Sequence, residues 1–117
     1  NPLACAAALA SLKVITGKGF LKKASETGVY FSECLQKLAH QHAIINDVRG
    51  KGMILAIELE KSGAQVVLDC MEKGFLINCI QQNVLRFLPP LNISRKDINS
   101  LMPVLSESLL RLSKSKI

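Results

Sequence analysis

The sequence predicts one α+β domain over 1–117, in which helices cover one face of a small, mainly antiparallel sheet. Three observations in the sequence support this fold class. Apolar residues recur at helical spacing near both ends, branched residues flank a glycine-rich turn in the middle, and two short apolar segments end at a proline pair. The chain of 117 residues is long enough to bury its own core. The expected order of elements is α-α-β-β-α-β-β-α.

The first helix is expected to run from the N-terminus to about Ile15. Asn1 can cap it, Pro2 suits its first turn, and the alanine-rich segment that follows is a strong helix former. The segment "TGKG" then ends it. A second helix is expected over about 18–42, because small or apolar residues share one helical face. These are Phe20, Ala24, Gly28, Phe31, Leu35 and Leu38.

Branched residues over 44–48 and 53–59 predict two strands joined by the turn "RGKG". We expect Arg49, Gly50 and Gly52 to shape this turn and to have no catalytic role. The two "GKG" triplets of the chain do not form a phosphate-binding loop. Neither has the preceding glycine at the required spacing, and neither has Ser or Thr after the lysine.

A third helix is expected over about 63–73, with a capping box formed by Ser62 and Gln65 and a stop at Gly74. The segments "FLINCI" and "NVLRFL" then predict two short strands. A proline pair follows the second segment and ends that strand, because proline has no N–H to donate to a ladder.

The last helix is expected to begin with a capping box of Ser94 and Asp97 and to carry an amphipathic pattern of leucines. Pro103 lies inside this pattern. Because proline removes an interior hydrogen bond and disfavours helix at the preceding residue, we expect either a kink or a later helix start.

The charge of the chain is +6, but its basic residues are scattered. The few aromatic side chains do not alternate with them, as a stacking platform for nucleic acid would require. No apolar run approaches the roughly 18–20 residues that span a bilayer. We therefore expect neither nucleic acid nor membrane as a partner. A free-standing module that binds a small anion or nucleic acid is the alternative, which a salt titration would test.

Cysteines and histidines show no metal-binding spacing. His40 and His42 are two residues apart and point to different sides of a helix, near whose C-terminus they are favourably placed. We expect no metal-binding residue, and reduced cysteines packed in the core of a cytoplasmic protein. The four cysteines are Cys5, Cys34, Cys70 and Cys79.

Arg86 is the residue to which we assign a binding role. In a strand, Val84, Arg86 and Leu88 share one face, while Leu85 and Phe87 share the other. This pattern holds a guanidinium among apolar side chains. A buried guanidinium needs an anionic partner, so we expect Arg86 either to reach water or to meet a negative group.

Three stretches resemble the C-terminal part of class III aminotransferases, which depend on pyridoxal phosphate. They are "NPLACAAALASLKVI", "VRGKGMILAIEL" and "LINCIQQNVLRFLPPLNIS". They occur in the family's order and at compatible spacing. The resemblance implies a C-terminal small domain whose large, cofactor-binding domain lies outside this chain. It also implies amino transfer between N-acetylornithine and 2-oxoglutarate in arginine biosynthesis, by a cytoplasmic homodimer. Ornithine or 4-aminobutyrate enzymes of the family are alternatives.

The resemblance also implies a role for Arg86, which falls in the family's "LRF-x-PPL" segment. In the family, that arginine lies at the active-site entrance and faces either the carboxylate of an amino-acid substrate or an acidic side chain that masks it. A salt bridge that only joins the two domains is the alternative. None of the eleven lysines matches the family's Schiff-base motif. We therefore assign no catalytic or cofactor-binding residue, and we predict that this chain alone neither binds pyridoxal phosphate tightly nor transaminates.

Overall fold

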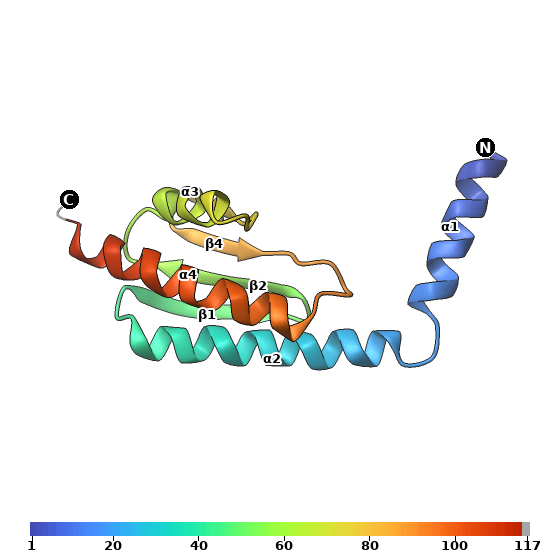
Figure 1. Ribbon diagram of the computed structural model, residues 1–117, viewed down its shortest axis with the longest axis horizontal. Helices are drawn as coiled ribbons and strands as arrows, with labels where there is room; N and C mark the ends of the chain where they lie inside the picture. Colours follow the sequence, from blue (N-terminus) through green and yellow to red (C-terminus); the bar gives the residue numbers. More distant parts are fainter. Residues whose placement is uncertain (116–117) are drawn as a thin grey trace.

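The computed structural model describes residues 1–115, and its elements follow the expected order, α-α-β-β-α-β-β-α (Figure 1). The α+β fold class is confirmed. The helices are α1 (Pro2–Ile15), α2 (Phe20–Gln41), α3 (Ala64–Glu72) and α4 (Arg95–Lys114). The strands are β1 (Ile45–Lys51), β2 (Ile54–Leu59), β3 (Asn78–Ile80) and β4 (Val84–Phe87).

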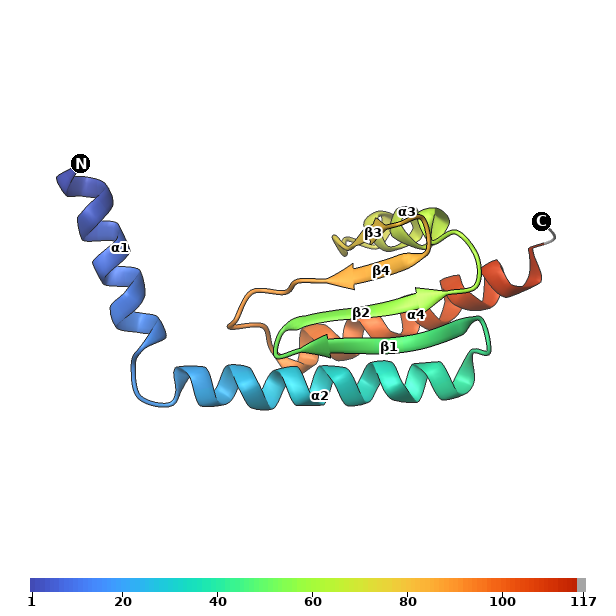
Figure 2. The same cartoon turned by 180° about the vertical axis from the view of Figure 1, so that it is seen from behind.

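The four strands form one sheet in the order β1-β2-β4-β3, and every neighbouring pair is antiparallel. Helices α2, α3 and α4 lie on one face of this sheet, as predicted. The opposite face is seen directly in Figure 2, where β1, β2 and β4 lie in front of α4. No other part of residues 1–115 covers it. We call the two sides the covered face and the open face.

The core lies between the covered face and the helices. Leu55 pairs with Phe87 and Ile57 with Leu85 across β2 and β4, and all four side chains are buried. The rings of Phe31 and Phe87 meet edge to face, with centroids 5.4 Å apart. Other buried residues come from the three covering helices: Leu35, Leu38, Val66, Cys70, Ile98, Leu105 and Leu109.

Helix α1 has the predicted bounds but does not cover the sheet. Asn1 caps it through Oδ1, which accepts from the backbone N–H of Leu3 at 3.0 Å. None of its residues is buried, and it projects from the rest of the chain (Figure 1). Its exposed apolar side chains include Leu9 and Val14. Within residues 1–115 no single helix is long and apolar enough to cross a membrane, and only α1 and α2 taken together, with a 66° bend, have the length and composition.

The hairpin turn is shorter than predicted. Strand β1 continues through Lys51, so Arg49 pairs with Ala56 instead of lying in the turn. The role expected for Arg49 and Gly50 in shaping the turn is therefore wrong. Gly50 lies in the ladder, where an added Cβ would clash with the carbonyl oxygen of Ile54. Gly52 does shape the turn, because its φ of 61° favours glycine.

Strand β3 is also shorter than the segment "FLINCI" predicted. Only its last three residues pair with β4, because β4 itself has four residues in the sheet. The connecting turn holds Gln81 and Gln82 at positive φ, 51° and 69°. Three hydrogen bonds of 2.8 Å fix this turn. The N–H groups of Leu59 and Gly63 donate to the carbonyls of Asn83 and Gln82, and the Asn83 side chain donates to the Leu59 carbonyl.

One of the two predicted capping boxes is wrong. Helix α3 is capped by Gly63, and the side chain of Gln65 donates to Asp69 at 3.0 Å instead of returning to Ser62. Gly74 follows α3 with a φ of 84°, as the predicted stop requires.

The second capping box is confirmed at the start of α4. Ser94 Oγ accepts from the backbone N–H of Asp97 at 3.2 Å, and the Ser94 N–H donates to the Asp97 carboxylate at 3.1 Å. These hydrogen bonds lower the pKa of Asp97, the Ser94 side chain having the larger effect. Because the helix begins at Arg95, the later start that Pro103 allowed does not occur.

A buried acid joins α3 to α4. Asp69 accepts hydrogen bonds from Ser108 and from Gln65, and its Oδ2 lies 3.3 Å from a terminal nitrogen of Arg111. The Ser108 hydroxyl, then the Gln65 amide and then the charge of Arg111 lower the pKa of Asp69, although burial opposes this. The side chain is thus charged and fully hydrogen-bonded on the covered side.

The expectation that the cysteines pack in the core is confirmed for Cys70, holds in part for Cys34 and Cys79, which pack against the core from its edge, and is wrong for Cys5. Burial, and to a lesser extent the charge of Asp69, raise the pKa of the Cys70 thiol to about 11. Cys34 and Cys79 are half-buried. Cys5 is exposed, because α1 packs against no other element at that point. All four thiols are free.

Candidate functional site

Arg86 lies on the open face, in the middle of the sheet. It pairs with Ala56 of β2 on one side and with Asn78 of β3 on the other. The predicted alternation is confirmed, since Leu85 and Phe87 point into the core. Of the two outcomes expected for Arg86, contact with water or with a negative group, the structure of residues 1–115 shows contact with water. Its side chain is half-buried, because no segment of residues 1–115 covers this face.

Asn78 fixes one edge of the guanidinium. The Nε of Arg86 donates to Asn78 Oδ1 at 3.3 Å. With Nε engaged, the two terminal nitrogens remain available for an external group. Both residues line a hollow of about 250 Å³, whose other walls are Leu76, Ile77 and Leu88. This arrangement suits a carboxylate, which a guanidinium binds through two parallel hydrogen bonds.

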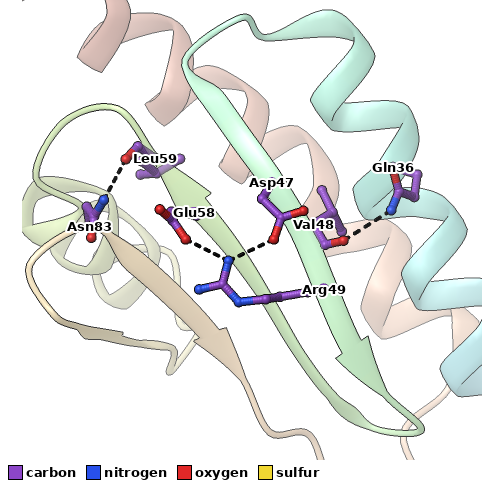
Figure 3. A network of polar contacts seen from close by, with 7 residues as sticks. All are labelled: Gln36, Asp47, Val48, Arg49, Glu58, Leu59 and Asn83. Atoms are coloured by element: carbon purple, nitrogen blue, oxygen red, sulfur yellow. Dashed lines mark hydrogen bonds and ion pairs between the residues drawn. The ribbon is translucent and has the colours of Figure 1, made fainter.

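No carboxylate of residues 1–115 forms an ion pair with Arg86. The acids of the open face bind Arg49 instead. A terminal nitrogen of Arg49 donates to Asp47 Oδ2 at 2.8 Å and to Glu58 Oε2 at 2.6 Å (Figure 3). These two hydrogen bonds, the one to Asp47 first, raise the pKa of Arg49. The open face therefore carries one arginine with two acids and one arginine with none.

The sequence did not reveal the roles of Asn78, Asp47 and Glu58. Asp47 and Arg49 are two apart in a strand, so their shared face could have been inferred. The contacts of Asn78 and Glu58 depend on strand pairing, which periodicity alone does not provide. The histidines lie at the end of α2, as predicted. His42 caps that helix, and its Nε2 lies 2.8 Å from Ser106 Oγ.

The residues around Arg86 do not fit pyridoxal phosphate by themselves. The hollow contains no lysine that could form an imine with the cofactor's aldehyde, and no acid that could face its ring nitrogen. Nor do residues 1–115 bring together three or more His, Cys, Asp or Glu side chains in positions to hold a metal ion. The chemical capacity of this site is recognition of an anion.

Known proteins of one family are similar to this chain in sequence and in fold. The family model for class III aminotransferases matches residues 1–109. The acetylornithine aminotransferase of Methanocaldococcus jannaschii is 45% identical over 114 residues, which cover 97% of this chain and 29% of that protein. Among solved structures, acetylornithine aminotransferase from Elizabethkingia anophelis superposes with a TM-score of 0.84 at 29% identity, covering 95% of this chain and 30% of that one.

An enzyme of different specificity is similar to the same extent. The ornithine aminotransferase from Toxoplasma gondii superposes with a TM-score of 0.85 at 28% identity, over 99% of this chain and 28% of that one. The chain thus spans less than a third of the length of the relatives it matches. Sequence and fold agree along nearly all of that span, and the chain belongs to the class III aminotransferase family.

Proposed function

We propose that these residues form the C-terminal small domain of an aminotransferase that moves an amino group between N-acetylornithine and 2-oxoglutarate. In this proposal the rest of the enzyme is a large domain outside the chain, and the complete enzyme is a cytoplasmic homodimer that serves arginine biosynthesis. The similarity to acetylornithine aminotransferases supports the choice of substrate. The observation that carries the proposal is Arg86, a half-buried cation with no acid partner among residues 1–115.

The proposed task of this domain is to bind and orient a substrate carboxylate. The terminal nitrogens of Arg86 would hold the two carboxylate oxygens, while Asn78 keeps the guanidinium plane fixed through Nε. Leu76 and Leu88 would limit the access of water to the ion pair from one side. Pyridoxal phosphate, held by the large domain, would supply the electron sink for amino transfer. The chain alone is proposed to be inactive, because it lacks the residues for that group.

Ornithine is the second candidate for the amino donor. The similarity to the Toxoplasma gondii enzyme supports it as directly as the other solved structure supports N-acetylornithine. If the acceptor is 2-oxoglutarate with either donor, the proposed role of Arg86 is the same in both reactions. Rates with each donor, measured on the full-length enzyme, would distinguish them.

Substitution of Arg86 in the full-length enzyme tests the proposal. If the ion pair is desolvated, Arg86→Ala should cost about 2–5 kcal/mol of productive binding, equivalent to a loss of roughly 30-fold to 4,000-fold in kcat/KM for 2-oxoglutarate. Arg86→Lys should lose less, since it keeps the charge but not the fork. Arg95→Ala is the matched control, because Arg95 stacks on the Tyr30 ring at 4.6 Å, outside the hollow.

Two results would separate the substrate role from a salt bridge between domains. Unchanged kinetics in both Arg86 variants would exclude the substrate role. A loss of thermal stability with unchanged KM would favour the salt bridge. Steady-state kinetics and thermal unfolding of the same preparations provide both measurements.

A further inference from the structure

Glu58 lies between two arginines on the open face. Ala56 pairs with Arg49 on one side and with Arg86 on the other. Glu58 is two residues further along β2 and pairs with Asp47 and with Val84. Both arginines are therefore diagonal neighbours of Glu58, a separation that long side chains can bridge. The same carboxylate could reach either cation.

The structure shows which arginine binds it. Glu58 Oε2 accepts from Arg49 at 2.6 Å, and Asp47 accepts from the same nitrogen at 2.8 Å (Figure 3). The hydrogen bond to Asp47 keeps the Arg49 guanidinium next to Glu58. The three side chains are all well exposed, so each ion pair is individually weak, and small changes can redirect a carboxylate from one cation to another.

We propose that Arg49 is a positioning residue that keeps Arg86 open to substrate. By binding Glu58, Arg49 prevents this carboxylate from occupying the guanidinium of Arg86. Without Arg49, Glu58 would turn to Arg86 and compete with the substrate carboxylate for the same donors. This inference rests on the proposed function, because it requires that Arg86 bind substrate.

Replacement of Arg49 in the full-length enzyme should raise KM without changing kcat. For Arg49→Met we expect KM for 2-oxoglutarate to rise about 5-fold, the usual scale of one exposed ion pair. The double variant Arg49→Met/Glu58→Gln should restore KM, because the competing charge is gone. KM of the Arg49→Lys variant should stay near the parent value, because the positive charge is kept. If Arg49 had a purely structural role, the removal of Glu58 would not restore KM.

Lys51→Met is the matched control. Lys51 lies on the same strand, two residues from Arg49, and forms no ion pair within residues 1–115. Its loss removes one positive charge from the face but releases no carboxylate. KM should therefore not change. A rise equal to that of Arg49→Met would show that net charge is the cause and would overturn the proposal.

The remaining outcomes are also decisive. If Arg86→Ala raises KM but Arg49→Met does not, Arg49 has no positioning role and the proposed function stands. If Arg49→Met raises KM but Glu58→Gln does not restore it, the mechanism through Glu58 is wrong. If Arg86→Ala leaves KM unchanged, the proposed function and this inference both fail. Glu58→Gln alone should leave KM unchanged, and a decrease would show that Arg49 does not restrain Glu58.

Discussion

The two faces of the sheet are built from alternate residues of the same strands, yet they differ in almost every physical property. On the covered face, Ile57 and Leu85 pack against three helices and exclude water. On the open face, the next residues along the strands include Glu58 and Arg86, and exposed Ile54 lies near the turn. Figures 1 and 2 show the two sides in turn. The difference indicates that the covered face stabilises the fold, while the open face carries the recognition role that we propose for Arg86.

Truncation of one isoleucine on each face should give the largest difference in the free energy of unfolding. Ile57→Ala removes a side chain that is 0% exposed, and it should lower the free energy of unfolding by about 3 kcal/mol. Ile54→Ala removes one that is 59% exposed on the same strand, and it should change the free energy by no more than about 0.5 kcal/mol. Urea denaturation of the chain measures both. Similar losses would show that the open face also supports the fold.

Substitution of one aspartate on each side of the sheet should give an intermediate difference in the free energy of unfolding. Asp69 is 7% exposed beneath the covered face, and Asp69→Asn should cost about 2 kcal/mol, because several hydrogen bonds to a charged group are weakened. Asp47→Asn, on the open face, should cost at most about 1 kcal/mol. Urea denaturation at neutral pH compares the two variants.

The pH dependence of stability tests whether the charge of Asp69 causes the loss expected for Asp69→Asn. The folded state lowers the pKa of Asp69, so its contribution is complete above the unfolded pKa of about 3.9. As pH falls below that value, the unfolded chain binds a proton first and stability decreases. The contribution is lost once pH has passed through the folded pKa. The cost of Asp69→Asn should therefore shrink in acid, and a cost independent of pH would contradict this account.

The smallest expected effect concerns Asn78. Asn78→Ala removes the acceptor that orients Arg86, and KM of the full-length enzyme for 2-oxoglutarate should rise about 5-fold, the scale of one hydrogen bond of about 1 kcal/mol. Stability should not change, because Asn78 is exposed on a three-residue edge strand. Asn46→Ala, also exposed, on the other edge strand, is the control. A loss of stability with unchanged KM would assign Asn78 to the fold alone.

The sequence predicted the fold better than the site. Helical and strand periods located every element, because they reflect which side chains meet the core. These periods failed where a contact with another residue or strand determines the local structure. The ladder to β2 extends β1 past Arg49, and Asp69 draws the side chain of Gln65 away from Ser62. The pairing of Arg49 with Glu58 was likewise not predictable, since it requires the register of two strands.

The turn over 81–83 has a consequence for tolerance to insertions. A slip of β4 by one residue against β2 would direct Arg86 inward and expose Leu85 and Phe87. The hydrogen bonds from Leu59 and Gly63 to this turn oppose such a slip. Surface loops usually accept an added residue, but here an insertion that moved β4 by one position against β2 would exchange a charge with the core. We infer that residues can be added before Gln82 more easily than between Asn83 and Arg86.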